Sequence, residues 1–170
     1  MTFTGGEPLF QPDFLLDCLK LCRKNSIHTT LDTCGFDQGN LLPEISKHVD
    51  LILFDLKIMN EAKHKQYTGV SNSPIKKSLK WLDAHHKNVW IRVPVIPAIT
   101  ATKENMDDIG RFIRSLEHTR RVHLLAYHDL GVLENFKKEN SFVSRVSIGE
   151  ALEQSRRTLE TYGLKVCSPE

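Results

Sequence analysis

Glycines and charged side chains follow several short apolar runs of this sequence, at points where strands of a parallel sheet would end. In parallel α/β proteins, ligands bind beyond the carboxyl ends of the strands, so these residues are expected to meet at one edge of a sheet. The pattern therefore predicts a binding site for a polar ligand. Its residues are Gly5, Gly6, Glu7, Asp32, Thr33, Asp55, Lys57, Arg92 and His128.

Each of these residues also has a purely structural interpretation. Gly5-Gly6 can form a tight turn, and Asp32 can cap the turn that follows it. The two charged ends of Asp55-Leu56-Lys57 share one face of a strand and can form an ion pair. Arg92 can neutralise a buried carboxylate, and His128 can be a hydrogen-bonded structural histidine. The binding interpretation therefore depends on all of them lying at one edge.

Short apolar runs alternate along the chain with segments whose apolar residues recur at helical spacing. This alternation is typical of an α/β fold with a mainly parallel sheet. Right-handed crossovers leave either a doubly wound sheet or a complete or partial barrel, and periodicity does not choose between them. The first expected strand is very short and ends at Phe3. The other expected strands cover residues 27–32, 49–56, 89–96, 122–127 and 164–167. The expected helices cover residues 12–24 and 41–48, begin at Ser73 and after Thr102, and run to Tyr162 from a capping box of Ser147 and Glu150.

The composition is that of an ordinary soluble globular protein, with 40% apolar and 26% charged residues in a chain of 170. The net charge of +2 is spread along the chain, which argues against nucleic acid or a membrane surface as a partner. No apolar run approaches the ~18 residues of a membrane-spanning helix, and the first residues lack the pattern of a secretory signal. We expect a cytoplasmic protein that forms a single domain over residues 1–170.

Five segments carry a family resemblance when they are taken together and in order. They are Thr4-Gly5-Gly6-Glu7-Pro8, Leu31-Asp32-Thr33-Cys34-Gly35, Phe54-Asp55-Leu56-Lys57, Trp90-Ile91-Arg92 and Tyr127-His128-Asp129-Leu130-Gly131. They resemble the motifs of the radical S-adenosylmethionine (SAM) proteins that activate glycyl-radical enzymes. Gly-Gly-Glu-Pro is common to many radical SAM proteins, whereas Asp-Leu-Lys and Tyr-His-x-Leu-Gly are more specific to the activases. The resemblance implies an α/β fold, a partial TIM-like barrel of the radical SAM type that lacks its first βα unit.

The same resemblance implies which residues bind the cofactor. Gly5, Gly6 and Glu7 would receive the amino group of the methionine part of SAM. Arg92 would face either SAM or the reacting peptide. Asp32 and Thr33 resemble a site for a monovalent cation, for which oxygen ligands are suited. The other implied SAM contacts are Asp55, Leu56, Lys57 and His128.

The resemblance further implies an oxidoreductase of anaerobic metabolism. Members of the family cleave SAM reductively at a [4Fe–4S] cluster. The resulting 5′-deoxyadenosyl radical takes a hydrogen atom from a glycine of the partner enzyme. The implied partners are a glycyl-radical enzyme such as pyruvate formate-lyase and a reductant, flavodoxin or ferredoxin.

The cysteine motif that holds the cluster in this family, Cys-x3-Cys-x2-Cys, is absent from the sequence. Cys18 and Cys22 have the first spacing, but no cysteine occupies the third position, and the pair lies on the apolar face of an expected helix. Cys34 and Cys167 are isolated. We therefore expect an N-terminally truncated activase that is inactive alone. The strand that ends at Phe3 would then be an open edge of the sheet, which favours self-association.

Two other functions remain open. The chain can be a non-catalytic fragment that binds SAM or the partner enzyme. It can also be a different barrel enzyme, in which Lys57 acts as a Schiff-base nucleophile beside Asp55.

Overall fold

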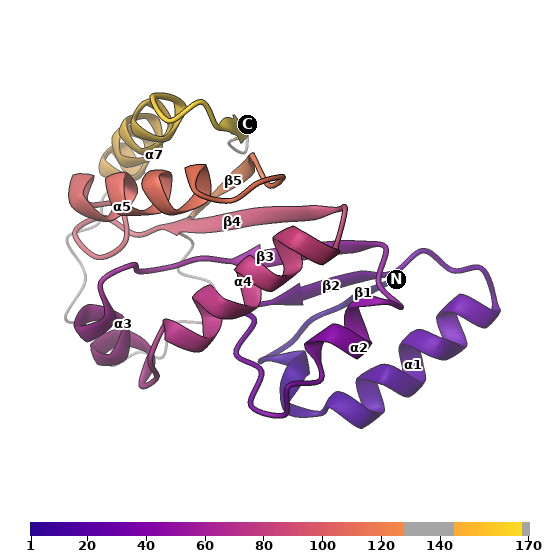
Figure 1. Ribbon diagram of the computed structural model, residues 1–170. Helices are drawn as coiled ribbons and strands as arrows, with labels where there is room; N and C mark the ends of the chain where they lie inside the picture. The colour runs from indigo at the N-terminus through magenta and orange to yellow at the C-terminus, as the bar shows by residue number, and fades with distance from the viewer. Residues whose placement is uncertain (128–144, 168–170) are drawn as a thin grey trace.

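The computed structural model of the chain describes residues 1–127 and 145–167. Within these residues, six parallel strands form one sheet in the order β1-β2-β3-β4-β5-β6 (Figure 1). Each strand lies beside the one that precedes it in the chain, and the order has no reversal of the kind that defines a doubly wound sheet. The predicted α/β fold of the partial-barrel type is therefore confirmed. The strands are β1 (Thr2–Phe3), β2 (Thr30–Thr33), β3 (Leu51–Asp55), β4 (Val89–Val95), β5 (Arg121–Ala126) and β6 (Lys165–Cys167).

Helices connect the strands, and most of them begin where the sequence predicts. Helix α1 covers Pro12–Lys24, with a proline in its first turn. The Thr102 hydroxyl accepts a hydrogen bond from the Asn105 N–H at 3.2 Å, which confirms Thr102 as the N-cap of α5 (Lys103–Arg114). The other helices are η1 (Pro8–Phe10), α2 (Leu42–Ser46), α3 (Glu61–Thr68), α4 (Ser73–His85) and α7 (Arg145–Glu160).

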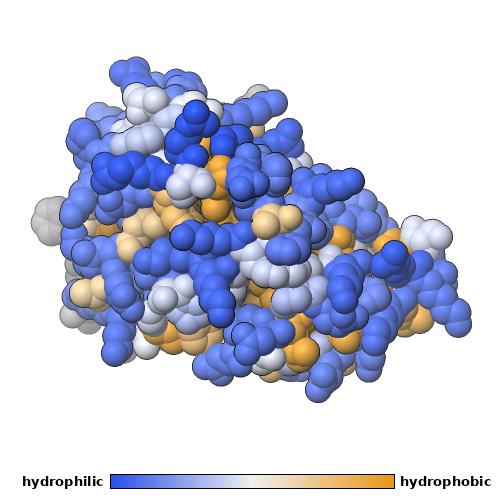
Figure 2. All heavy atoms as spheres, in the orientation of Figure 1, coloured by the Kyte–Doolittle hydropathy of each residue, from blue (hydrophilic) through white to orange (hydrophobic). Residues whose placement is uncertain are grey.

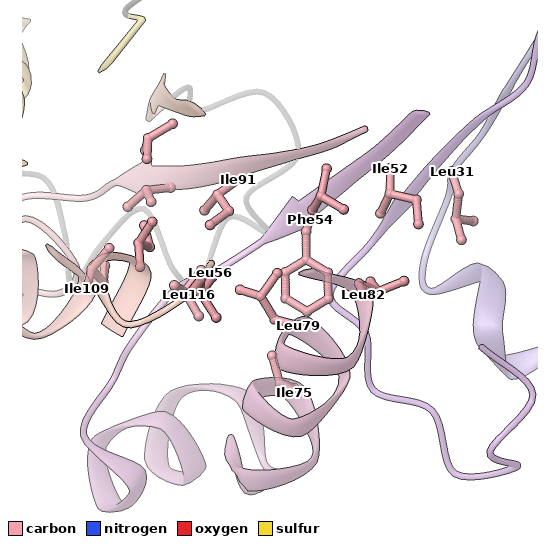
Figure 3. Packing of buried hydrophobic residues seen from close by; sticks show 14 of the residues in the cluster. Leu31, Ile52, Phe54, Leu56, Ile75, Leu79, Leu82, Ile91, Ile109 and Leu116 are labelled. Atoms are coloured by element: carbon pink, nitrogen blue, oxygen red, sulfur yellow. The ribbon is translucent and has the colours of Figure 1, made fainter. Parts of the chain in front are cut away.

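The hydrophobic core lies between the sheet and the helices that cover one of its faces. In β3, Ile52 and Phe54 are fully buried and alternate with half-buried residues, as the two-residue period of a strand requires. Figure 3 shows the Phe54 ring against Leu79 of α4, with Ile75 on the next turn of the same helix. Because this face of β3 is filled by the core, the alternate residue Asp55 points to the other face of the sheet.

The surface seen in Figure 2 is mainly hydrophilic, with hydrophobic residues in separate groups. Several large apolar side chains are nevertheless exposed, and Phe10, Phe14 and Leu21 among them belong to η1 and α1. Met1 is also exposed, and its sulfur lies 3.8 Å from the Cys22 sulfur of α1. The Met1 contact places α1 beside the start of β1, which ends the sheet in the described part of the chain. No helix among the described residues is long and apolar enough to span a membrane.

The second strand starts later than predicted. We expected it at Ile27, but the backbone N–H of Ile27 donates to the Cys22 carbonyl at 2.9 Å and still belongs to the turn that ends α1. Ser26 adopts a left-handed φ of 56° in this turn. Pairing with β1 begins only at Thr30, whose N–H donates to the Met1 carbonyl at 2.8 Å. Residues 27–29, which the apolar pattern assigned to the strand, therefore belong to the chain reversal between α1 and β2.

The structure differs from the helix predictions at one helix start and by one additional helix. The predicted capping box at Ser147 is wrong, because α7 already begins at Arg145 and Ser147 lies inside the helix. Helix α3 was not predicted, because His64 is its single buried residue and it has no apolar repeat. Its ends carry ordinary signals that the apolar pattern overlooks. The Asn60 side chain accepts from Lys63 N–H at 3.0 Å, and Gly69 ends the helix with a φ of 80°.

Candidate functional site

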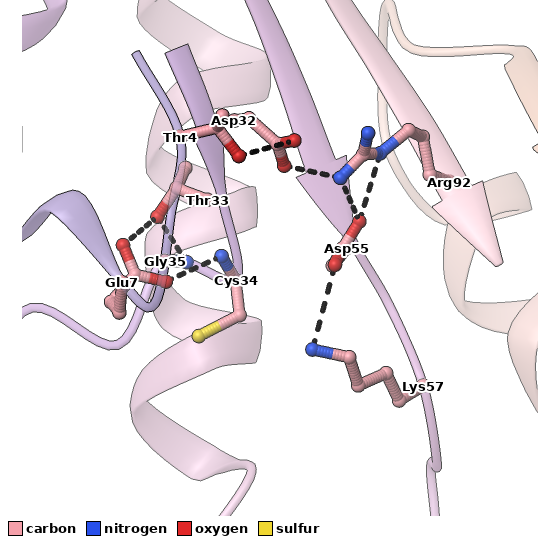
Figure 4. A network of polar contacts seen from close by, with 9 residues as sticks. All are labelled: Thr4, Glu7, Asp32, Thr33, Cys34, Gly35, Asp55, Lys57 and Arg92. Carbon is pink, nitrogen blue, oxygen red and sulfur yellow. Dashed lines mark hydrogen bonds and ion pairs between the residues drawn. The ribbon is translucent and has the colours of Figure 1, made fainter. Parts of the chain in front are cut away.

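The carboxyl ends of β2, β3 and β4 bring four charged side chains into one row (Figure 4). Parallel pairing places Asp55 of β3 directly beside Arg92 of β4. Arg92 Nε donates to Asp55 Oδ1 at 2.9 Å, and Nη2 forms an ion pair with the same oxygen at 2.8 Å. Nη2 also donates to Asp32 of β2. Lys57 Nζ lies 3.5 Å from Asp55 Oδ2. We call Asp32, Arg92, Asp55 and Lys57 the charged row, because negative and positive side chains alternate along it.

The charged row is partly shielded from water. The side chains of Asp32, Arg92 and Asp55 are 18%, 19% and 20% exposed, and that of Lys57 is 38% exposed. Thr4 at the end of β1 adds a hydrogen bond from its hydroxyl to Asp32 Oδ2 at 2.9 Å. Ion pairs in such a setting are stronger than fully exposed ones. The geometry therefore shows Arg92 neutralising two carboxylates, while the more exposed Lys57 ammonium is the cation of the row that a ligand can reach most easily.

Glu7 ties the loop after β1 to the loop after β2. Its Oε1 accepts from the Thr33 hydroxyl at 2.6 Å and from Leu9 N–H at 3.2 Å, and its Oε2 accepts from Cys34 N–H at 2.8 Å. The Thr33 hydroxyl in turn accepts from Gly35 N–H at 2.9 Å. Three acceptor positions of the carboxylate are thus used inside the chain, so a ligand ammonium would meet a Glu7 that is already held in place.

The Cys34 thiol lies beside this carboxylate. Burial, followed by the hydrogen bond and the negative charge of Glu7, raises the pKa of the Cys34 thiol to about 12. Replacing Glu7 by glutamine removes the charge, so the pKa of Cys34 should fall while burial keeps it above its usual value. Because each pKa unit changes the thiolate fraction about tenfold, we expect Cys34 to be alkylated several times faster in Glu7→Gln at mildly alkaline pH.

Alkylation rates can be measured for each cysteine by peptide mass spectrometry. Cys18 in α1 is an internal reference, because its rate should not change. Glu104→Gln is the matched control, since Glu104 is exposed on α5 and pairs with Lys63. An unchanged Cys34 rate in Glu7→Gln would contradict the electrostatic coupling of these two groups.

The backbone at Gly5 and Gly6 is open to a ligand. Both glycines are exposed and have positive φ angles, 96° and 55°. A side-chain carbon added at either position would meet no atom within 4 Å. Residues with a side chain rarely adopt these angles, so glycine suits the turn, and the free space suits the predicted close approach of a ligand.

A pocket of about 190 Å³ lies beside the charged row. Glu7, Asp55 and Lys57 line it, together with Cys34 and with His64 of α3. His64 is 3% exposed, and its Nδ1 lies 2.8 Å from the Val70 carbonyl, so Nδ1 carries a hydrogen and donates it to that oxygen. The pocket therefore joins three of the predicted site residues to two that sequence reasoning did not place there.

The remaining predicted residues are placed differently. Leu56 is 1% exposed and belongs to the core, so it can meet a ligand only through its backbone. The side chains of Asp32 and Thr33 leave opposite faces of β2, and one joins Arg92 while the other joins Glu7. Their cation site stays a prediction. His128 lies outside the described residues.

The four cysteines do not form a metal site. Cys18 and Cys22 lie on α1, Cys34 follows β2 and Cys167 lies on β6. Within residues 1–127 and 145–167, no group of three or more histidine, cysteine or acidic side chains is arranged to hold a metal ion.

Two asparagines were missed by the sequence analysis. Asn72 and Asn105 are 1% and 7% exposed, and both bind the backbone that follows Asp55. Each lies at the start of a helix, where asparagine is ordinarily interpreted as a cap. Only the three-dimensional arrangement shows that their side chains reach a distant loop.

Comparison with known proteins gives consistent matches. Residues 1–116 match the family model of the Radical SAM superfamily. The pyruvate formate-lyase-activating enzyme of Clostridium pasteurianum is 38% identical over 162 residues, covering 95% of this chain and 67% of that protein. The pyruvate formate-lyase 1-activating enzyme of Escherichia coli (strain K12) is 33% identical over 174 residues, covering 98% of this chain and 70% of that protein. A crystal structure of a domain of pyruvate-formate lyase-activating enzyme from Bacteroides vulgatus ATCC 8482 superposes with a TM-score of 0.81 at 31% identity, covering 100% of this chain and 98% of that one.

Proposed function

Because this chain belongs to the Radical SAM superfamily, and within it to the pyruvate formate-lyase-activating enzymes, we propose that it binds SAM at the charged row as part of a glycyl-radical-enzyme activase. The complete reaction would be the reductive cleavage of SAM to a 5′-deoxyadenosyl radical that removes a hydrogen atom from a glycine of the partner. A glycyl-radical enzyme such as pyruvate formate-lyase is the proposed partner, and flavodoxin or ferredoxin the proposed reductant.

The alternation of charge beside an open glycine turn supports this proposal most directly. The methionine end of SAM carries an ammonium and a carboxylate, so it needs neighbouring groups of both signs. The carbonyls of the exposed Gly5 and Gly6 can accept from the ammonium, and the half-exposed Lys57 can pair with the carboxylate. Arg92 would hold Asp55 and Asp32 in place before the ligand arrives, which lowers the cost of ordering the site.

The residues present do not fit the iron–sulfur cluster. The chain has four cysteines, all of them among the described residues, and they are divided among α1, the loop after β2 and β6. Three thiolates cannot meet at one iron–sulfur cluster from these positions. We therefore propose that this chain by itself assembles no stable [4Fe–4S] cluster and does not cleave SAM.

SAM binding tests the proposal without requiring turnover. In calorimetry, Lys57→Met should weaken SAM binding by about tenfold, since one charge-assisted contact is lost. Lys87→Met is the matched control, because Lys87 is exposed at the opposite end of the sheet, just before β4, and its loss should leave the affinity unchanged. Equal affinities of wild type and Lys57→Met would reject the charged row as the SAM site.

Anaerobic reconstitution with iron and sulfide tests the proposal that the chain is inactive alone, and a partner-binding assay tests the alternative of a non-catalytic binding fragment. We expect wild type to bind SAM but to retain no four-iron cluster after desalting. A stable cluster with SAM cleavage would overturn the proposal that the chain is inactive alone. Binding of the partner enzyme without a cluster would instead favour the fragment.

Self-association also stays a prediction. In the described part of the chain β1 pairs with β2 alone, and the exposed Phe14 and Leu21 lie on the neighbouring α1. An open strand edge beside exposed apolar side chains is a favourable surface for contact with another chain.

A further inference from the structure

The backbone that carries Lys57 leaves the sheet immediately after β3. Leu56 N–H donates to the Arg92 carbonyl at 2.9 Å, and this bond is the last rung that joins β3 to β4. Beyond it, the carbonyls of Lys57, Ile58 and Met59 and the N–H of Met59 bind no strand. Buried backbone groups need partners, so the way in which these four are satisfied decides how firmly the segment is held.

Asn105 of α5 binds both ends of this segment. Its Oδ1 accepts from Met59 N–H at 2.9 Å, and its Nδ2 donates to the Lys57 carbonyl at 2.9 Å. The second Nδ2 hydrogen goes to the Thr100 carbonyl at 2.8 Å. The orientation of the amide is fixed, because a flipped side chain would set its oxygen against two carbonyls and its nitrogen against an N–H.

Asn72, just before α4, holds the middle of the same segment. Its Nδ2 donates to the Ile58 carbonyl at 3.0 Å and to the Met59 carbonyl at 2.8 Å. The Ile58 side chain is 3% exposed and anchors the segment in the apolar interior. Two buried asparagines, one just before α4 and one in α5, thus supply the partners of these four backbone groups.

We propose that Asn105 is a positioning residue for Lys57, which it places against Asp55 by fixing the backbone on both sides of Ile58. The proposal rests on the proposed function, in which Lys57 meets SAM. A lysine side chain is long and flexible, so the direction in which it leaves the backbone determines where its ammonium can reach. Asn105 also binds Thr100 in the loop after β4, so the same side chain joins the loops that follow the strands of Asp55 and Arg92.

Amide hydrogen exchange tests the positioning without any ligand. In Asn105→Ala, the Met59 amide loses its acceptor and should exchange about tenfold faster or more. Asn60→Ala is the matched control in the same loop, because the Asn60 side chain accepts from Lys63 N–H and caps α3 instead of binding the backbone of Lys57 or Met59. Far-UV circular dichroism checks that each variant is folded. If Asn105→Ala does not fold, Asn105→Ser is used in its place. Unchanged Met59 exchange in a folded Asn105 variant would overturn the proposal.

A double-mutant cycle on SAM affinity tests whether Asn105 acts through Lys57. We expect Asn105→Ala and Lys57→Met each to weaken binding by about tenfold, and their combination to weaken it no further. Losses that multiply would show that Asn105 acts on the ligand by another route and would overturn the proposal. If wild type binds no SAM, the proposed function fails, whereas the exchange result still decides whether Asn105 positions the Lys57 segment.

Discussion

Replacing Arg92 by methionine is expected to lower the free energy of unfolding by about 3 kcal/mol at pH 7, because it leaves two shielded carboxylates without their shared cation. Asp32 and Asp55 are each about one-fifth exposed, and Arg92 donates to both. After the substitution Lys57, 3.5 Å from Asp55, would be the remaining cation of the charged row. Urea denaturation monitored by circular dichroism measures the loss.

The cause can be separated from a simple packing defect. Arg92→Lys keeps the charge but loses the planar fork that joins two carboxylates, so it should recover part of the stability. Adding Asp32→Asn to Arg92→Met removes one uncompensated charge and should also recover part of it. If neither change recovers stability, the loss comes from packing, and the electrostatic account of the charged row is wrong.

SAM affinity should follow the same order of variants. Asp55 lies between Arg92 and Lys57, so a displaced Asp55 would also displace the Lys57 ammonium. A variant that regains stability and SAM affinity together would show that the ion pairs organise the site. A variant that regains stability alone would show that Arg92 contacts the ligand itself, which was one of its two predicted roles.

Residues with a strong local pattern could be predicted from the sequence. Helix α1 begins at Pro12 and ends at Lys24 as expected, since proline, apolar spacing and a terminal asparagine all agree there. The charged row was also predictable in outline, because side chains at the ends of parallel strands must meet. The sequence could not show that Arg92 lies between two carboxylates, since that depends on the register that pairs Asp55 with Arg92.

Residues whose partners are distant in the chain could not be predicted. Glu7 accepts from Thr33 and Cys34, more than 25 residues away, and no local pattern indicates such a contact. Asn105 reaches 46 and 48 residues back to Met59 and Lys57. Polar residues near helix ends are ordinarily solvated or act as caps, so their burial becomes evident only when the helices pack.

Asp83 of α4 is the second place where a single substitution should have a large effect. Its carboxylate is 4% exposed and accepts from the N–H groups of Glu117, His118 and Thr119, at 2.6, 3.1 and 2.7 Å. These bonds join α4 to the turn between α5 and β5. Asp83→Asn would set an amide N–H against buried N–H groups, so it should lower the free energy of unfolding by about 3 kcal/mol at pH 7.

The pH dependence of this loss identifies its cause. Burial by itself would raise the pKa of Asp83, but the hydrogen bonds from Thr119, Glu117 and His118 outweigh it, and the pKa is lowered. A carboxyl group with a lowered folded-state pKa stabilises the fold above its unfolded-state pKa, about 4, and this contribution is lost as the pH falls through the folded-state value. The difference between wild type and Asp83→Asn should therefore be complete at pH 7 and shrink below about pH 4.

Urea titrations at a series of pH values measure this difference directly. Asp108→Asn is the matched control, because the Asp108 carboxylate pairs with the exposed Arg111 on the outside of α5 and should change stability little at any pH. A difference between wild type and Asp83→Asn that stays constant down to acid pH would mean that shape rather than charge holds the turn. A shrinking difference would instead show that an ionised carboxylate, buried away from the charged row, fixes α4 beneath the strands that carry Asp55 and Arg92.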